Sequence, residues 1–209
     1  FKNILTKVRN QKFLVYYNES LYLKQHIIYY KKKTNVSNLN IIIKLPFDLF
    51  DQRYYIITAL NDILTSDLNS LLLKVLRNQH GLIYDCEGHL DIDEESQDLS
   101  CLTIETTCIT KNLTKVLELI IETLNFIKTN NIDKKYIASY KSDVDILKQN
   151  SLFSKTPKIV VNNYSKYTLW NKPLIRFHEN YRNLGNISQL KLRKMANLIF
   201  NKNNMVVCY

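Results

Sequence analysis

The sequence predicts an α+β fold, in which an antiparallel-rich mixed sheet carries helices packed on one face. Two observations indicate this class: short β-prone runs come in pairs around polar loops, and helical stretches follow them. The chain has no solenoid-type internal repeat and no Pro/Gly-rich linker. We therefore expect a single domain over residues 1–209, with residues 1–20 as a candidate linking segment from a preceding domain.

Three β-prone runs open the chain. "KFLVYY" covers residues 12–17, "HIIYYKKK" covers residues 26–33, and "LNIIIKLPF" covers residues 39–47. The second and third flank the polar "TNVSN" as two strands flank a loop, because β-branched and aromatic residues favour strands. Pro46 is expected to end the third strand, since proline cannot continue a strand ladder.

Two helices are expected next. Asp51 suits an N-cap, and residues 52–64 then place apolar side chains at helical spacing. The residues expected on the buried face are Tyr55, Ile56, Ala59, Leu60, Ile63 and Leu64. A short helix over residues 70–79 follows, and Gly81 stands just past it, where a left-handed C-cap residue is common.

Residues 82–87 and 99–109 are predicted to form an antiparallel strand pair around the acidic loop "DIDEESQD", residues 91–98. The loop is interpreted as a hydrated hairpin tip, although metal binding stays open as an alternative. Its spacing does not fit a calcium loop, because the sixth-position glycine is absent.

The last third of the chain is predicted less completely. Helices are expected over residues 113–127 and from Asp133 onward, the second with Ile137, Tyr140, Val144 and Leu147 inward. Residues 152–182 show no pattern that we can assign. Asn186 with Gln189 resembles a capping box for a helix, and "MVVCY" at the end reads as a strand. The predicted core residues are Ile41, Ile43, Leu60, Ile63, Leu82, Leu102, Ile104, Val116, Ile120 and Leu198.

Composition bounds the environment of the chain. It is 45 % hydrophobic and 23 % charged, as soluble globular proteins are, and no apolar run is long enough for a membrane-spanning helix. The four cysteines form no C-x-x-C pair, so we interpret them as small buried hydrophobes rather than a disulfide framework. The compartment is unknown; a reducing one, the cytosol or the mitochondrial matrix, is expected.

The formal net charge of +10 invites a nucleic-acid hypothesis. Lys31–Lys33 form the one tight basic run, however, and the other lysines are spread as they would be on a solvated surface. We therefore expect no nucleic-acid partner. A contiguous basic face with strongly salt-dependent binding would favour that alternative.

Motifs for catalysis are absent. No H-x-x-E-H or H-E-x-x-H spacing places two histidines and a glutamate around zinc, and no G-x-S-x-G or glycine-rich phosphate loop is present. A Ser-His or Cys-His pair could still assemble from distant positions. The sequence therefore indicates no catalytic residue, no metal ligand and no bound cofactor in this chain.

One stretch carries a family resemblance. "LTSDLNSLLLKVLRNQHGLIYDCEG", residues 64–88, resembles the signature of the second, zinc-free domain of insulinase/pitrilysin-type (inverzincin) zinc metallopeptidases, most closely the branch of the mitochondrial processing peptidase. Asn69-Ser70 stand at the family's serine pair, and Gly81 to Tyr84 match its Gly-Leu-x-Tyr. Thr65 to Asp67 replace the family's turn glycines, so that turn is expected to differ. The resemblance extends over about residues 27–209.

The resemblance implies a function in proteolysis. Two or more such domains enclose an extended peptide, and only the first carries zinc, so a zinc-bearing homologous domain is expected in cis or in trans. The substrate-binding roles of the family's arginine and tyrosine carry over to Arg77 and Tyr84. Whether the chain is part of an active enzyme stays uncertain, because it lacks the zinc motif itself.

The chemistry of these two side chains fits such roles. An arginine offers several donors to a peptide carbonyl, and a tyrosine hydroxyl can stabilise the oxyanion that develops during peptide hydrolysis. A purely structural interpretation is also available, because Arg77 would complement a helix dipole and tyrosine favours strands. At the level of the whole chain, the alternative is an inactive scaffold subunit or domain of a larger assembly.

Overall fold

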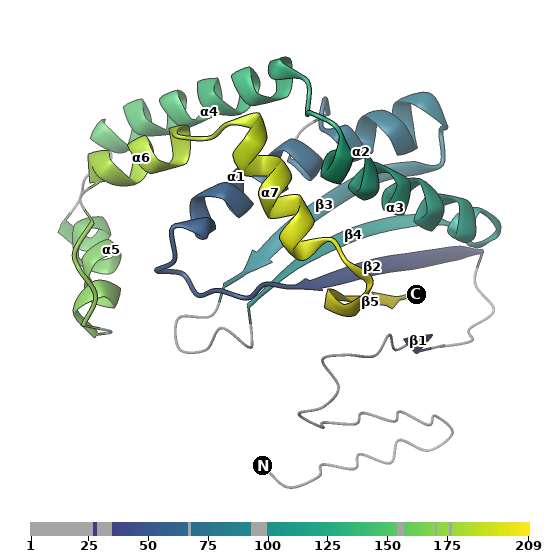
Figure 1. Cartoon of the computed structure of the whole chain (residues 1–209), viewed down its shortest axis with the longest axis horizontal. Coiled ribbons are helices and arrows are strands. Elements are labelled where there is room, and N and C mark those ends of the chain that lie inside the picture. Colours follow the sequence, from purple (N-terminus) through teal and green to yellow (C-terminus); the bar gives the residue numbers. More distant parts are fainter. Residues whose placement is uncertain are drawn as a thin grey trace, which may run out of the picture.

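The structure, a computed structural model, describes residues 27–28, 35–66, 68–92, 100–153, 157–169, 171–175 and 177–209. Its sheet has the strand order β1-β5-β2-β4-β3 (Figure 1). The strands are β1 (Ile27–Ile28), β2 (Val36–Lys44), β3 (Ile83–Asp91), β4 (Cys101–Ile109) and β5 (Met205–Cys208). The strands from β5 to β3 pair antiparallel, and β1 pairs in parallel with β5.

Helices cover one face of this sheet, which confirms the predicted α+β class (Figure 1). α1, α3 and α7 lie on the sheet, and α4 and α6 pack on the outer side of α1. The helical segments are α1 (Arg53–Thr65), α2 (Leu71–Leu73), η2 (Lys74–Gln79), η4 (Thr110–Asn112), α3 (Leu113–Thr129), α4 (Lys134–Phe153), α5 (Pro157–Leu169), α6 (Phe177–Gly185), α7 (Gln189–Ile199) and η5 (Lys202–Asn204).

Strand β2 shows why the sheet has one covered face. Leu39, Ile41 and Ile43 are fully buried, whereas Ile42 between them is 36 % exposed. Side chains of a strand point alternately to its two faces, so the odd-numbered residues pack under the helices. Across the ladder Ile41 stands opposite Ile104, which is also buried. The apolar core therefore lies between the helices and this single face of the sheet.

The predicted core is confirmed for most of its residues. Ile41, Ile43, Leu60, Ile63, Leu102, Ile104, Val116 and Ile120 are all buried. Leu82 is only partly buried, although it packs against the core. Leu198 was predicted wrongly, because its side chain is 40 % exposed. The residues that α7 buries form one stripe of the helix, and Leu198 lies outside this stripe: Leu192, Met195, Ala196 and Ile199.

Other inward positions also need correction. On α1 five of the six predicted residues are buried, but Ile56 is only partly buried and its neighbour Ile57 is buried instead. On α4 Tyr140 and Val144 are buried as predicted, but Leu147 is 55 % exposed. Beyond Val144 the described side chains of α4 up to residue 150 are exposed, so this end of the helix packs little.

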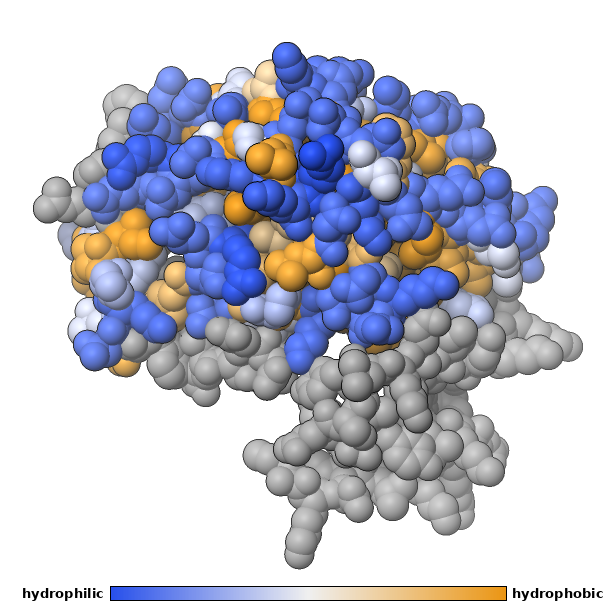
Figure 2. Space-filling model, in the orientation of Figure 1, coloured by the Kyte–Doolittle hydropathy of each residue, from blue (hydrophilic) through white to orange (hydrophobic). Residues whose placement is uncertain are grey.

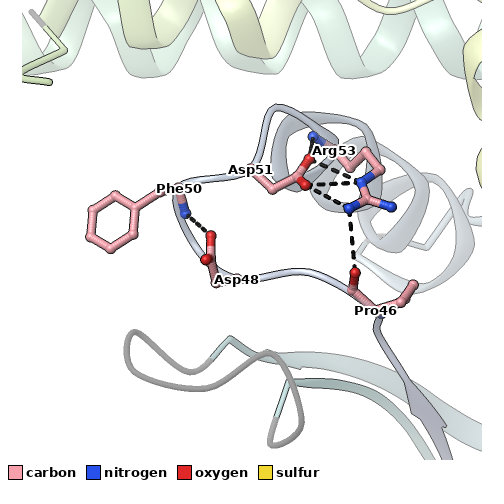
Figure 3. Close-up of polar contacts among 5 residues, drawn as sticks. All are labelled: Pro46, Asp48, Phe50, Asp51 and Arg53. Atoms are coloured by element: carbon pink, nitrogen blue, oxygen red, sulfur yellow. Dashed lines mark hydrogen bonds and ion pairs between the residues drawn. The ribbon is translucent and has the colours of Figure 1, made fainter. Parts of the chain in front are cut away.

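Two predicted caps are shifted. The N-cap of α1 is Gln52 and not Asp51, but the Asp51 carboxylate still accepts a hydrogen bond from the backbone N–H of Arg53 at 2.7 Å (Figure 3). The Arg53 guanidinium also pairs with Asp51 and lies over the Phe47 ring. At α7, Ser188 is the N-cap and accepts from the N–H of Lys191, so Asn186 is not the capping residue.

The stretch from residue 152 to 182, left unassigned above, contains regular structure. α4 continues to Phe153, and α5 and the start of α6 fall within the stretch. α6 packs on α4 and α1, so long-range packing supports it where local sequence pattern is weak. Three predicted features lie outside the described residues: the strand at residues 12–17, the basic run Lys31–Lys33, and most of the acidic loop at residues 91–98.

The cysteines are free thiols in the described part of the chain. Cys86 and Cys108 are buried as predicted, whereas Cys101 and Cys208 are partly exposed. Burial raises the pKa of the Cys86 thiol to about 12, so it stays neutral and packs as a small apolar side chain. Among the described helices, none has the length and apolarity needed to cross a lipid bilayer.

Candidate functional site

Arg77 and Tyr84 meet at the outermost described strand of the sheet. The Arg77 guanidinium carbon lies 5.0 Å from the centroid of the Tyr84 ring, which is cation–π stacking distance. Tyr84 is 77 % exposed and Arg77 is half-buried. The two side chains that the sequence singles out are therefore together on the surface, and the core does not enclose them.

Arg77 is positioned by a turn of π-helix. After α2, the backbone widens into η2, and Arg77 lies in its last turn. π-Helical turns are rare, and they occur frequently at functional sites. Within this segment Leu76 is fully buried, so it anchors the turn to the core while its neighbour Arg77 reaches the surface.

Gly81 closes this turn. Its φ of 61° is in the left-handed region, as predicted for a C-cap. The N–H of Gly81 donates to the carbonyl of Arg77, and the N–H of Leu82 donates to the carbonyl of Leu76. Each bond spans one residue more than in the Schellman motif of an α-helix, as a π-helical end requires. The chain then enters β3 at Ile83, one residue before Tyr84.

A bulge in β3 presents Tyr84. Ile83 stands opposite Cys108, and Cys86 stands opposite Thr106, so Tyr84 and Asp85 together face Thr107 alone. Two residues against one define a β-bulge, which re-aims side chains at sheet edges. Thr106 stabilises the irregularity by donating its hydroxyl to the carbonyl of Asp85 at 2.6 Å. No residue pattern in the sequence indicates this bulge.

A close approach between α1 and β3 holds the strand. A side chain at Gly88 would collide with the side-chain oxygens of Asn61 and Thr65. Asn61 donates from its amide to the Gly88 carbonyl at 3.2 Å, and both Asn61 and Thr65 are buried. Sequence reasoning missed these three residues. An isolated glycine inside a strand is the signal that could have found them.

The predicted difference in the turn before α2 is consistent with the backbone. Thr65 ends α1, and Ser66 follows in a right-handed conformation. Gly81 and Asn171 are the described residues with positive φ, so neither Thr65 nor Ser66 adopts a glycine-type conformation. Ser70, at the position of the family's serine pair, is the N-cap of α2, but its hydroxyl makes no capping hydrogen bond.

The face of the sheet opposite the helices is polar beside Tyr84. Glu87 on β3 stands directly opposite Glu105 on β4, and both are exposed. Like charges placed directly opposite one another destabilise a sheet. His89 is the near neighbour of this pair, with its Nε2 3.4 Å from a carboxylate oxygen of Glu87.

The described residues show no metal site. Nowhere in the described ranges do three or more His, Cys, Asp or Glu side chains gather closely enough to hold a metal ion. Arg77 and Tyr84 also offer no ligand set of the type that zinc prefers.

A hollow lies on the helix side of the sheet. It has a volume of about 550 Å³ and lies between α3, the end of α7 and β5. Leu117, Ile121, Phe200, Met205 and Val207 contribute apolar surface to it. Figure 2 shows exposed apolar residues in this region between hydrophilic helix surfaces. The helix layer thus leaves the β5 end of the sheet incompletely covered.

Comparisons with known proteins identify the family. Residues 1–144 match the family model described as the peptidase M16 inactive domain. No curated protein matches the sequence. The match confirms the family and the second, inactive domain that the resemblance indicated, whereas the processing-peptidase branch stays a prediction.

Solved structures share the fold at low sequence identity. A peptidase M16 inactive domain from Pseudomonas fluorescens has a TM-score of 0.70 at 14 % identity, with 88 % of this chain and 42 % of that chain covered. A protease from Helicobacter pylori has a TM-score of 0.66 at 15 % identity, covering 88 % and 42 %. Complex III2 from Candida albicans contains a chain with a TM-score of 0.68 at 10 % identity, covering 88 % and 45 %.

The present chain thus spans about two fifths of the length of these relatives. The family model covers well over half of the 209 residues, from the first strand region into α4. The structural neighbours support the same fold over most of the remainder. The chain therefore belongs to the peptidase M16 inactive domain family.

Proposed function

We propose that this chain is the zinc-free half of a metalloendopeptidase, which holds an extended peptide opposite a zinc-bearing homologous domain in cis or in trans. The observation that carries the proposal is the stacked pair of Arg77 and Tyr84 at the exposed edge of the sheet. The relatives are more than twice as long as this chain, which leaves room for such a second domain in them.

The stacked arrangement prepares both groups for a ligand. Within the described residues, neither the Arg77 guanidinium nor the Tyr84 hydroxyl makes a hydrogen bond or an ion pair. The cation–π contact with the Tyr84 ring does not use the guanidinium N–H groups for hydrogen bonds to another residue, so they can donate to a ligand. Arg77 would donate to a carbonyl of the bound peptide, and Tyr84 would donate its hydroxyl to the oxyanion that develops during hydrolysis.

The edge position suits an extended substrate. β3 ends the strand order, so in the described part of the chain no strand pairs with its outer edge. An extended peptide can add to such an edge through main-chain hydrogen bonds. The zinc of the partner domain would supply the activation of water, and residues of this chain would supply position and charge stabilisation.

The negative charge of Glu87 and Glu105 on the polar face of the sheet favours substrates with basic side chains. Glu87 and Glu105 repel each other across the β3–β4 ladder, and a lysine or arginine of the substrate would relieve that repulsion. We therefore expect cleavage to favour peptides with basic side chains near the scissile bond.

The test is peptide cleavage by the assembled enzyme after Arg77→Ala and Tyr84→Phe. We expect kcat/KM to fall about 10²-fold for Tyr84→Phe, since a lost oxyanion donor costs on the order of 10²–10³ in rate. For Arg77→Ala we expect a fall of about 10- to 10²-fold, because a charged hydrogen bond to the substrate, worth about 1.5–3 kcal/mol, is lost. Tyr84→Phe keeps the ring that Arg77 stacks on, so it isolates the hydroxyl. Lys172→Ala is the matched control, because it removes a cation 5.3 Å from the ring of Phe50 at a different part of the molecule.

An inactive scaffold is the second candidate, favoured by the likeness to a chain in Complex III2 from Candida albicans. Unchanged kcat/KM in both Arg77→Ala and Tyr84→Phe would refute the peptide-holding role. A gene that encodes no H-x-x-E-H motif, together with no partner that carries one, would favour the scaffold.

A further inference from the structure

A polar cavity of about 500 Å³ lies between α1, α2 with η2, and α4. Asp62 of α1, Ser70 and Lys74 of the second helical segment, and Lys135, Tyr140 and Asp143 of α4 line it. Its volume falls in the range of roughly 300–1,000 Å³ that is typical of ligand pockets. Neither Arg77 nor Tyr84 contributes to it.

Two buried hydroxyls of this cavity have no partner. The Ser70 and Tyr140 side chains are 2 % and 4 % exposed, and neither oxygen makes a hydrogen bond within the described structure. A buried polar group without a partner is unfavourable, so native proteins nearly always satisfy such groups. These hydroxyls indicate a polar molecule in the cavity.

The two aspartates that line the cavity lack a cation. Asp62 and Asp143 approach each other from α1 and α4, and no described ion pair or side-chain hydrogen bond neutralises either carboxylate. Burial raises the pKa of Asp62 to about 6, and the neighbouring Asp143 adds to the shift. A carboxylate in this setting is stabilised by any cation that enters.

Two lysines, Lys74 and Lys135, line the same cavity. The backbone N–H of Lys135 donates to the Asp133 carboxylate at 3.0 Å and lowers the pKa of that group, and the charges of Lys135 and Lys74 add to the effect. Lys135 is 3.3 Å from Asp133 and is partly neutralised by it. Lys74 has no described ion-pair partner. The cavity wall thus offers both carboxylates and ammonium groups.

We propose that this cavity binds a small zwitterion with a free amino group and a free carboxylate, of the size of an amino acid or a very short peptide. The amino group is held by Asp62 and Asp143, with the hydroxyls of Ser70 and Tyr140 as further hydrogen-bond partners. The carboxylate is held by Lys74 and Lys135. This site goes beyond the proposed function and does not depend on it.

The test is calorimetric titration of the full-length protein that contains this chain with three peptides: free trialanine, N-acetyl-trialanine and trialanine amide. We expect free trialanine to bind, the acetylated peptide to show no binding, and the amide to bind at least about tenfold more weakly. A tenfold change corresponds to about 1.4 kcal/mol. Equal binding of all three peptides, or no binding of free trialanine, would overturn the proposal.

Variants locate the site. Asp62→Asn and, as a second variant, Asp143→Asn are each expected to raise the dissociation constant about tenfold, since each removes a charged acceptor for the ammonium group. Asp145→Asn is the matched control, because Asp145 is an exposed aspartate of α4 outside the cavity. Binding that is equally weakened by Asp145→Asn, or unaffected by both cavity variants, would place the ligand elsewhere.

A pH series provides a readout that does not use a ligand. The pKa of Asp62 in the folded protein is about 6, above its ordinary value near 3.8. The charged carboxylate therefore lowers the free energy of unfolding by its full amount above about pH 6. This loss of stability disappears as the pH falls toward 4. Asp62→Asn is therefore expected to unfold at a higher temperature than the wild type at pH 7, with the difference narrowing toward pH 4. Equal unfolding temperatures of Asp62→Asn and the wild type at pH 7 would mean that a cation already neutralises Asp62. This result would contradict the inference that the two carboxylates have no partner.

Discussion

The two faces of the sheet are built on opposite rules. On the helix side, Ile41 and Ile104 meet across the ladder and are fully or almost fully buried. On the other side, one residue further along each strand, Ile42 is partly exposed, and Glu105 faces another glutamate. The buried isoleucines of the first face stabilise the fold. On the second face, the repulsion between Glu87 and Glu105 lowers the stability of the sheet. That contrast is what the proposed binding of a basic peptide to the polar face would require.

Replacing neighbouring isoleucines of β2 gives the largest expected contrast between the faces. Ile41→Ala is expected to lower the free energy of unfolding by about 2–5 kcal/mol, because it leaves a cavity in the core. Ile42→Ala removes the same atoms from the open face and is expected to cost less than about 1 kcal/mol. Chemical denaturation of the two variants measures the difference. Equal losses would show that the open face is also packed.

Filling the close approach at Gly88 tests how tightly the helix layer fixes β3. Gly88→Ala places a methyl group against Asn61 and Thr65, and both side chains are buried. We expect a loss of about 1–3 kcal/mol, as for other overpacked sites. Gly185→Ala is the control, since a methyl group there meets no atom within 4 Å. A Gly88→Ala protein as stable as wild type would mean that α1 can shift away from the strand freely.

Removing one charge from the open face gives the smallest effect and a gain. Glu105→Gln is expected to stabilise the protein by about 0.2–1 kcal/mol at low salt, because Glu87 loses its like-charged neighbour. The gain should shrink as salt screens the repulsion. Glu118→Gln is the opposite-sign control, since Glu118 pairs with Lys115 at 3.7 Å. A stability loss in Glu105→Gln would show that Glu105 has a favourable partner.

The core was predictable because it follows local periodicity. Alternation in β2 and the three-and-four spacing in α3 identify buried residues such as Ile43 and Ile120 without tertiary information. Leu198 was misplaced because it was chosen for its apolar character, although α7 turns a different stripe toward the core. The periodicity of α7 would have excluded it.

The site was predictable only in part. The sequence and its resemblance pointed to Arg77 and Tyr84, and Gly81 was recognised as a helix end. Their stacking depends on a widened helical turn and a strand bulge, which arise from packing rather than from residue type. The cavity between α1 and α4 was missed entirely, because Asp62 and Asp143 come together only in the folded chain.

The widened turn at Lys74–Gln79 has a consequence for how this protein tolerates changes in length. A π-helical turn holds one residue more than the α-helical turn it replaces. Deleting a single residue between Leu73 and Arg77 would remove this extra residue and restore regular winding, so the guanidinium would keep nearly the same direction around the helix axis. Winding the same number of residues as a regular α-helix would instead turn the guanidinium away from the phenol. The pair should therefore tolerate the loss of one amino acid in this turn better than a change of winding at constant length.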